Sequence, residues 1–251
     1  MFFGAEVCAP WPHTPRGRMI AEGQRHLTLA FLGTASFDAL QPLLLHFPRP
    51  TFSIGPVGKC DRLLFIPEEH PRAAAYHVEW FHGDLTSLYA ALQTWLSLKD
   101  TRAFLPHVTV ARSPFDKAEW QAGFQEFPLL IRAIHLYEST GQLNYEPLWT
   151  YPLILPFEEL EHTADIAFVI RGEDLNALFA HAQTALSFKF PQFLPYFSKT
   201  IPKTLDALIT ALNQGISIAD REVGCPFKAV SFHGEILQKE SLLHWEMIVD
   251  V

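Results

Sequence analysis

Hydrophobic and polar positions alternate, or recur at helical spacing, along most of the 251 residues. Alternation with a period of two predicts strands, and apolar residues every three to four positions predict helices. Over the first 150 residues this pattern predicts strands at 1–7, 26–33, 51–57, 63–66, 74–80, 104–111 and 129–137, and helices at 37–45, 84–98 and 116–124. Strands mixed with helices in this way indicate a compact α+β unit.

A proline-containing segment at 151–156 ends this unit and predicts a boundary between a domain over 1–153 and a domain over 157–251. The second part begins with a predicted strand at 161–169 and an amphipathic helix at 173–186. An aromatic and proline-rich stretch, a short helix and two closing strands follow, at 188–202, 205–212, 229–237 and 242–251. The last two strands would suit a hairpin.

Composition places the chain among packed globular proteins. Hydrophobic residues make up 49% and charged residues 18%, which excludes intrinsic disorder. The apolar stretches are shorter than the roughly 20 residues of a membrane span, and the first residues do not resemble a secretory signal. Three scattered cysteines predict neither a disulfide framework nor a zinc site. We therefore expect a cytoplasmic protein with no membrane partner.

The net charge of −8 argues against a protein that binds long nucleic acids through many phosphate contacts. Residues 1–150 hold 12 Lys/Arg and 14 Asp/Glu, and residues 151–251 hold 7 and 13, so neither half is basic. We expect no DNA partner. A nucleic-acid substrate fits only if it is read locally, for example at one chain end.

Two short segments resemble each other, His26 to Leu29 (HLTL) and His107 to Val110 (HVTV). Because side chains alternate along a strand, each segment would present an imidazole and a hydroxyl on one face and two apolar side chains on the other. About 0.7 His-x-Thr matches are expected by chance, so the bare pattern equally fits ordinary polar strand faces. The 81 residues between the histidines would let two structural lobes contribute one strand each.

In their context, these segments resemble a known family. Residues 25–33 (RHLTLAFLG) and 104–112 (FLPHVTVAR) are similar to the signatures of the 2H phosphoesterases, in particular the RNA 2′,3′-cyclic phosphodiesterase branch, also called 2′-5′ RNA ligase. Residues 136–140 (LYEST), with Tyr145 and Leu148, add to the resemblance, which covers 1–153. It implies a two-lobed α+β fold with antiparallel sheets around a central cleft. The Pro/Gly-rich loop 9–25 departs from the family, where a helix usually precedes the first motif.

The chemistry implied is opening of a 2′,3′-cyclic phosphate on RNA to a 2′-phosphate. Of His26 and His107, one would deprotonate the attacking water and the other would protonate the departing 3′ oxygen, and either assignment is open. Thr28 and Thr109 would donate hydrogen bonds to the phosphate oxygens. Arg112 could add a charge-assisted contact to the phosphate. Strict alternation places Arg112 on the face opposite to His107, so such a contact needs a bulge or a strand end. The alternative is that Arg112 is a surface arginine. The scheme requires no cofactor.

The remaining histidines and aromatic residues have simpler interpretations. Eight histidines are expected to be surface or hydrogen-bonded structural residues: His13, His46, His70, His77, His82, His135, His181 and His244. Four aromatic residues could stack on a base but are more typical of a core: Trp80, Phe81, Tyr89 and Trp95.

The second part resembles archease, a small protein that supports the tRNA-splicing RNA ligase. The resemblance lies in 162–165 (HTAD), 175–186, 227–234 and 249–251, covers 157–251, and is poor between 188 and 225. It implies that Asp165 and Asp250 bind a divalent cation such as Mg²⁺, Ca²⁺ or Mn²⁺, and that an RNA ligase is a partner. Glu161 stands where the family has Asp, and the middle is shorter, so a remnant that keeps only the fold is the alternative. A lone Lys228 is more typical of a solvated position.

Together these features predict a two-domain protein concerned with RNA 3′ ends. Two alternatives are open. The same histidines could join 2′-5′ linkages reversibly, or the whole chain could be a non-enzymatic accessory factor for an RNA ligase.

Overall fold

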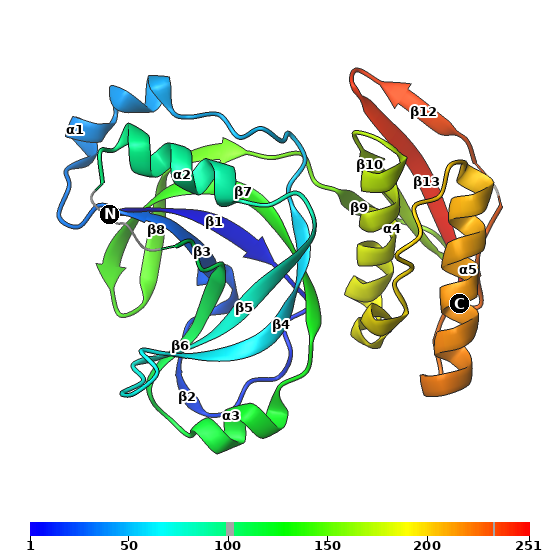
Figure 1. The fold of residues 1–251 in the computed structure, drawn as a ribbon, viewed down its shortest axis with the longest axis horizontal. Coiled ribbons are helices and arrows are strands. Elements are labelled where there is room, and N and C mark those ends of the chain that lie inside the picture. Colours follow the sequence, from blue (N-terminus) through cyan, green and yellow to red (C-terminus); the bar gives the residue numbers. More distant parts are fainter. Residues whose placement is uncertain (99–102, 233) are drawn as a thin grey trace.

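The computed structural model describes residues 1–98, 103–232 and 234–251, and it is an α+β structure built on two antiparallel sheets (Figure 1). The first sheet has eight strands, from β1 (Phe2–Cys8) to β8 (Asn144–Pro152). The second has five, from β9 (Phe157–Leu160) to β13 (Leu242–Asp250). The α+β class and the antiparallel sheets predicted from the sequence are therefore confirmed.

The other strands and the helices follow in chain order. The first part contains β2 (Gly17–Met19), β3 (His26–Phe31), α1 (Phe37–Leu40), β4 (Val57–Ile66), β5 (Ala73–His82), α2 (Thr86–Trp95), β6 (His107–Phe115), α3 (Lys117–Gly123) and β7 (Phe127–Gly141). The second contains β10 (Ile166–Gly172), α4 (Leu175–Lys189), α5 (Leu205–Val223), β11 (Ala229–Val230) and β12 (Ile236–Lys239). Short 3₁₀ turns cover Glu22–Gln24, Leu43–His46 and Pro191–Tyr196 (η1, η2 and η3).

Six strands of the first sheet close on themselves. The pairings run β1–β3–β6–β5–β4–β7, and β7 pairs back onto β1. One joint in this ring is narrow, since β3 and β6 share the single pair Leu27 and Val108. The ring thus consists of two strand groups, β1, β3 and β7 on one side and β4, β5 and β6 on the other. The two His-x-Thr strands meet where these groups touch.

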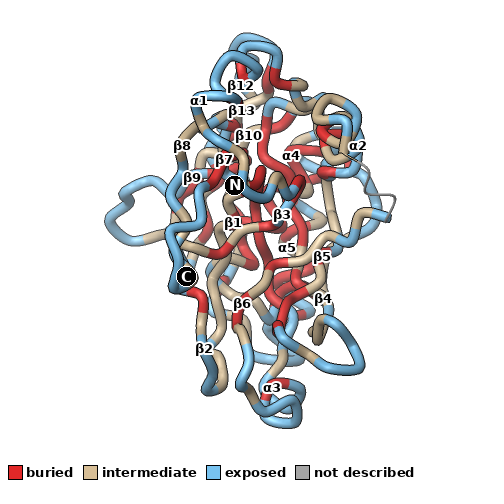
Figure 2. Tube along the Cα trace, turned by 90° about the vertical axis from the view of Figure 1, so that its left-hand side faces the viewer, coloured by how far each residue is buried: buried red, intermediate tan, exposed pale blue. Residues whose placement is uncertain are grey.

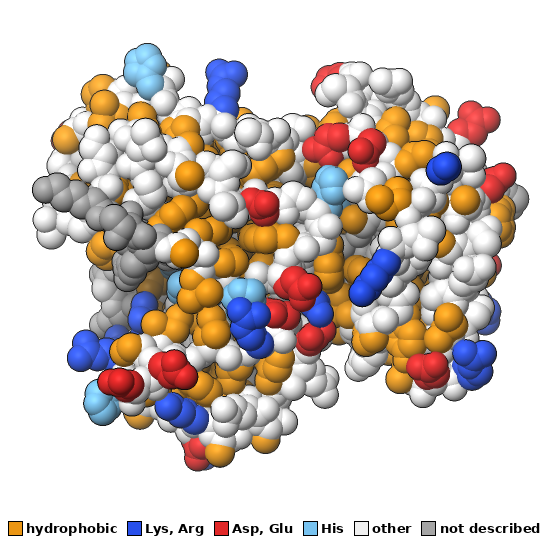
Figure 3. All heavy atoms as spheres, viewed as in Figure 1, with side chains coloured by type: hydrophobic (Ala, Val, Ile, Leu, Met, Phe, Trp, Pro, Cys, Tyr) orange, Lys and Arg blue, Asp and Glu red, His pale blue; other side chains and the backbone are white. Residues whose placement is uncertain are grey.

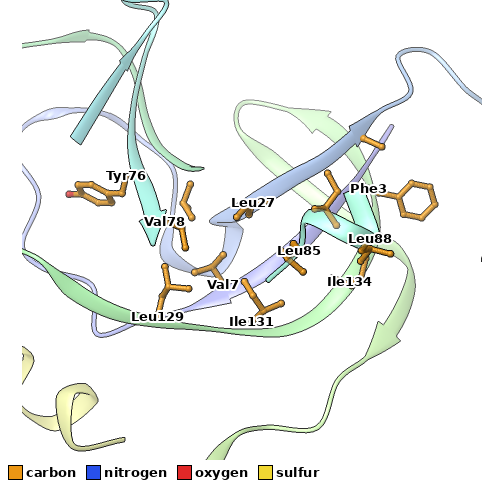
Figure 4. Close-up of a cluster of buried hydrophobic side chains, with 14 of the residues drawn as sticks. Phe3, Val7, Leu27, Tyr76, Val78, Leu85, Leu88, Leu129, Ile131 and Ile134 are labelled. Carbon is orange, nitrogen blue, oxygen red and sulfur yellow. The ribbon is translucent and has the colours of Figure 1, made fainter. Parts of the chain in front are cut away.

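The interior of the ring is filled by apolar side chains. Figure 4 shows Val7, Leu27, Val78, Leu129 and Ile131 directed at one another from the strands of the ring, and each is buried. The tube in Figure 2 shows the same distribution, with buried segments at the centre and exposed turns at the ends of the strands. Because one face of β3 and β6 supplies this core, their other face is left for polar side chains.

Helix α4 lies between the two sheets (Figure 1). It is buried on both sides, since ten of its fifteen residues are buried, and a helix buried all round is sandwiched between layers. Val57 and Leu130 of the first sheet share one hydrophobic cluster with Leu178 and Phe179 of α4. The change from one sheet to the next falls between Pro152 and Phe157; the division into two domains at that point stays a prediction.

Several predicted elements of the first part were wrong. The expected strand at 51–57 is irregular apart from an isolated bridge at Ile54 and its last residue, Val57, which begins β4. The helix predicted at 37–45 is divided by Pro42, which follows the end of α1. The segment expected to be a loop, 9–25, contains β2. Strand β8 was not predicted, because its exposed polar and aromatic residues carry no clear alternation; it is held by pairing with β7.

In the second part, the strand predicted at 161–169 starts only at Ile166, and the one predicted at 229–237 is divided into β11 and β12. Helix α5 runs well beyond the predicted end at 212. It continues through Gly215, where an added Cβ would lie 3.1 Å from the carbonyl oxygen of Tyr196, so a residue unfavourable in helices is used for close packing. Strands β12 and β13 form the expected hairpin. None of the helices in the described residues is long and apolar enough to span a bilayer.

Candidate active site

The two His-x-Thr segments lie side by side on adjacent antiparallel strands. Leu27 of β3 pairs with Val108 of β6, and both are fully buried. Continuing this register by one residue places His26 opposite Thr109 and Thr28 opposite His107. Because neighbouring side chains on a strand point to opposite faces, all four polar groups lie on the outer face. Each histidine faces the threonine of the other strand.

A bulge in β3 follows the first motif. In the pairing with β1, Thr28 lies opposite Gly4 and Ala30 lies opposite Phe3, so Leu29 is the extra residue. Leu29 and Ala30 are accordingly both buried in succession. The alternation resumes one residue late and turns Phe31 to the outer face, where 73% of it is exposed.

A matching bulge follows the second motif. In the pairing with β5, Thr109 lies opposite Ala75 and Ala111 lies opposite Ala74, so Val110 is the extra residue and both it and Ala111 are buried. Arg112 is thereby returned to the face of His107. A contact between Arg112 and a phosphate at His107 required a bulge or a strand end, and this is such a bulge. Phe31 follows His26 by five residues, as Arg112 follows His107. This equivalence is the sequence signal that could have placed Phe31 on the face of the histidines.

Both imidazoles are oriented by the same local hydrogen bond. His26 Nδ1 lies 2.8 Å from the carbonyl oxygen of Gln24, and His107 Nδ1 lies 2.8 Å from that of Leu105. A carbonyl oxygen can only accept, so Nδ1 carries the proton and donates in each ring. The free lone pair of each neutral ring is therefore on Nε2, for which the described residues provide no hydrogen-bond partner.

The surroundings of both rings disfavour the charged imidazolium. Burial lowers the pKa of His26 from 6.5 to about 4, against the opposing hydrogen bond to Gln24, with the nearby positive charges of Arg112 and His107 adding to the decrease. Burial also lowers the pKa of His107, and His77 and Arg112 contribute in the same direction. At neutral pH the neutral form of both imidazoles is therefore favoured. Arg112 is close enough to act on both.

A third imidazole lies beside His107. His77 on β5 pairs directly with His107, and its Nδ1 lies 2.5 Å from Oδ1 of Asp61. Asp61 and Arg62 lie at a bulge in β4, and their side chains are 2.7 Å apart. The sequence predicted that His77 is a surface or hydrogen-bonded structural residue, and its contact with Asp61 agrees with this. Nothing in the sequence indicates that it adjoins His107, because that depends on the β5–β6 register.

Aromatic side chains enclose His26 on the side of β1, β7 and β8. The ring centroids of Phe2 and Tyr145 each lie 4.7 Å from that of His26, and that of Tyr137 lies 5.3 Å away. The backbone N–H of Tyr145 donates to Oε1 of Gln24 at 2.6 Å, which ties β8 to the loop that orients His26. Strand β8, missed from the sequence, is therefore part of the wall of the site.

Next to Thr28 and His107 the surface is hollowed. This hollow has a volume of about 560 Å³, and its walls include Phe31, Tyr89 and Phe104. Tyr89 and Phe104 are stacked, with centroids 4.6 Å apart and planes inclined by 24°. In the view of Figure 3, charged residues and a histidine lie together at the position of β5 and β4. Hydrophobic side chains gather higher in the same view, between these strands and α2. Tyr89 is therefore not the core residue expected, whereas Trp80 and Trp95 pack against the core.

The residues predicted to bind a metal lie in the second sheet. Ile166 pairs with Val249, so the register brings Asp165 next to Asp250. The side chain of Asp165 has His162 as a neighbour, whose Nδ1 is 3.9 Å from Oδ2. Among the described residues, which omit His233, no group of three or more His, Cys, Asp or Glu side chains could hold a metal ion. Two carboxylates supply fewer than the six or more oxygen ligands of Ca²⁺, and a metal site at Asp165 and Asp250 stays a prediction.

Comparisons with known proteins were made for the whole chain. No family model matches it, and no curated protein does. Solved structures that match include Escherichia coli LigT in its apo form, at 22% identity and a TM-score of 0.43, over 61% of this chain and 96% of that one. A structure titled phosphoesterase (22%, 0.42, over 61% and 97%) and TT0787 of Thermus thermophilus (17%, 0.42, over 61% and 96%) also match. With TM-scores this low, the assignment of the site rests on its own geometry.

Proposed function

We propose that the outer face of β3 and β6 hydrolyses 2′,3′-cyclic phosphate ends of RNA to 2′-phosphates, without a metal, by acid–base catalysis from His26 and His107. The observation that carries this proposal is the two imidazoles placed diagonally across β3 and β6, each with Nδ1 hydrogen-bonded to a backbone carbonyl and with Nε2 available to a substrate. Two such nitrogens on one face can serve one phosphorus centre from its two sides. The two strand groups that meet at Leu27 and Val108 would be the two lobes of a 2H phosphoesterase.

The proposed reaction follows from these positions. One neutral imidazole takes a proton from the attacking water as its oxygen bonds to phosphorus, and the other, protonated, gives its proton to the 3′ oxygen as the P–O3′ bond breaks. Thr28 and Thr109 donate to the non-bridging oxygens, and Arg112 compensates the charge that builds there. Because both rings are neutral at rest, one proton is taken up when the anionic phosphate binds and stabilises an imidazolium.

The hollow beside Thr28 and His107 suits the nucleoside part of such a substrate. Phe31 offers an exposed aromatic face, and the stacked pair of Tyr89 and Phe104 forms another wall. RNA-binding proteins stack unpaired bases on aromatic side chains of this kind. We therefore assign the terminal base to this hollow.

The test is turnover of an oligonucleotide with a 2′,3′-cyclic phosphate end by the purified protein, with and without EDTA, the product being identified as a 2′- or 3′-phosphate. The proposal expects a 2′-phosphate and a rate that chelation leaves unchanged. A rate abolished by EDTA would point to a metal mechanism and rule out the two-histidine scheme. Formation of 2′-5′ linkages faster than opening of the cyclic phosphate would favour the ligase alternative.

For the second sheet, the archease-like assignment, the metal and the RNA ligase partner stay predictions from sequence resemblance, as does a cytoplasmic location. No step of the proposed reaction depends on them. An accessory role for the whole chain would be favoured if the purified protein failed to open the cyclic phosphate but bound an RNA ligase.

A further inference from the structure

Strand β2 adds a second arginine to the outer face. It lies in the Pro/Gly-rich segment 9–25 and pairs with the end of β6, where Arg18 is directly opposite Arg112. The neighbouring pair, Met19 and Ala111, is turned toward the core, so both arginines belong to the outer face that carries the histidines. Like charges directly opposite each other on adjacent strands destabilise a sheet.

No carboxylate in the described part of the chain forms an ion pair with either arginine. Other arginines of this protein do have such partners: Arg62 pairs with Asp61, Arg132 with Glu6 and Arg171 with Glu158. Arg18 borders a hollow of about 870 Å³ together with Arg16, Lys117, Asp116 and Glu119. Asp116 caps α3 there, with its Oδ1 accepting the backbone N–H groups of Ala118 and Glu119. Two arginines directly opposite each other, with no ion-pair partner among the described residues, suit an anion that comes from a ligand.

The positions of the two arginines give this anion a place along the substrate. Arg112 acts electrostatically on both His26 and His107, so it adjoins the reacting phosphate. Arg18 lies on β2, which pairs with the same edge of β6 as β3 does, but farther along β6 from the histidines. An RNA whose 3′ end carries the cyclic phosphate continues only in the 5′ direction, and its next negative charge is the phosphodiester of the preceding nucleotide.

We propose that Arg18, beside Arg112, binds this preceding phosphodiester, which makes the protein selective for RNA chains over cyclic mononucleotides. The inference rests on the proposed function, whose reacting phosphate it takes as its reference point. A guanidinium can contact a phosphate through two parallel hydrogen bonds, so Arg112 would serve the reacting phosphate and Arg18 the preceding one. The loop that departs from the expected helix thus acquires a role in specificity.

The test compares kcat/KM for a 2′,3′-cyclic mononucleotide and for a dinucleotide with the same cyclic end. Wild-type protein is expected to favour the dinucleotide by about tenfold or more, as one charge-assisted contact provides. Arg18→Gln should remove this preference by lowering kcat/KM for the dinucleotide to the level of the mononucleotide. A dinucleotide with an uncharged methylphosphonate linkage should behave with wild-type protein like the mononucleotide, which tests the charge without any mutation.

Arg16→Gln is the matched control, because it removes the same charge two residues away, at a position with no partner strand residue on β6. Equal losses in both variants would indicate general attraction by positive charge and overturn the assigned contact, as would equal turnover of both substrates by wild-type protein. If neither substrate were hydrolysed, the proposed function would fail. Calorimetric binding of a 2′-phosphate-ended dinucleotide and mononucleotide would then decide the Arg18 contact separately, and equal affinities would overturn it.

Discussion

The outer face of β3 and β6 and the junction between the two sheets hold histidines in similar local settings. His181 of α4 hydrogen-bonds through Nδ1 to the carbonyl oxygen of Arg171, as His26 does to that of Gln24. Burial lowers the pKa of both rings to about 4. The difference lies at Nε2. In His181 this atom is buried and has no hydrogen-bond partner among the described residues, and the ring of His82 packs edge-on, with centroids 5.4 Å apart.

A fixed tautomer and a lowered pKa therefore do not distinguish a catalytic imidazole from a structural one. His107 borders a hollow that also exposes Thr28, whereas His181 is enclosed by the packing of α4 between two sheets. What makes the first region a candidate active site is access for a ligand, together with hydroxyl and guanidinium groups on the same face. The predictions below test this contrast, from the largest expected effect to the smallest.

Removal of either outer-face imidazole should have the largest effect. His26→Ala and His107→Ala are each expected to lower kcat for the cyclic phosphate by about 10²-fold or more, because each removes one proton transfer. His181→Ala should leave kcat within about twofold at a temperature where the variant is folded, as checked by circular dichroism. If either outer-face variant kept near full activity, the catalytic role of the substituted histidine would be disproved.

Loss of Arg112 should have a smaller effect on the same reaction. Arg112→Gln is expected to reduce kcat/KM by about tenfold, since one charge-assisted contact to the phosphate is lost. Arg62→Gln is the control, because that arginine is exposed and pairs with Asp61 at the next bulge. If the two substitutions had equal effects, Arg112 would be an ordinary surface arginine.

The pH dependence of kcat/KM should reflect the lowered pKa values of His26 and His107. One ring must be protonated in the free protein or on binding, and both pKa values lie below 6.5. Above neutral pH the protonated fraction falls about tenfold per pH unit, so kcat/KM is expected to decrease by that factor between about pH 7 and 8. An activity that rises over this range would contradict the two-histidine scheme.

At the junction, His181 should affect stability instead of activity. Its pKa is about 4 when folded and 6.5 in the reference state, so the unfolded chain binds a proton between these values and the folded protein does not. Stability is therefore full above about pH 6.5 and is lost as the pH falls toward 4, by about 1.4 kcal/mol per pH unit for this group. Urea unfolding at pH 7 and pH 5 should show a smaller difference for His181→Gln than for wild-type protein, and an unchanged difference would disprove the link.

The weakest effect is expected in the second sheet. Two carboxylates, Asp165 and Asp250, give at most weak binding of Mg²⁺, Ca²⁺ or Mn²⁺, so calorimetric titration of the full chain should show millimolar affinity or none. Asp250→Asn should abolish any heat of binding that is seen. Micromolar binding would show that ligands outside the described residues, or water, complete the site.

The chain itself determined the two His-x-Thr strands, because polar and apolar residues alternate there with one face committed to the core. It also determined the α+β class and most of the helix starts. The sequence did not predict strand β8 or the extension of α5 through Gly215. Strand β8 is stabilised by pairing with β7, and the end of α5 by packing against η3.

Only the tertiary structure decided which residues join the histidines. Strict alternation places Arg112 and Phe31 on the wrong face, and bulges at Val110 and Leu29 return them, because an extra residue in one strand reverses the alternation beyond it. Alternation is a local property that the sequence shows directly. Bulges and register arise from pairing between segments far apart in the chain, and these pairings put Arg18 beside Arg112 and His77 beside His107.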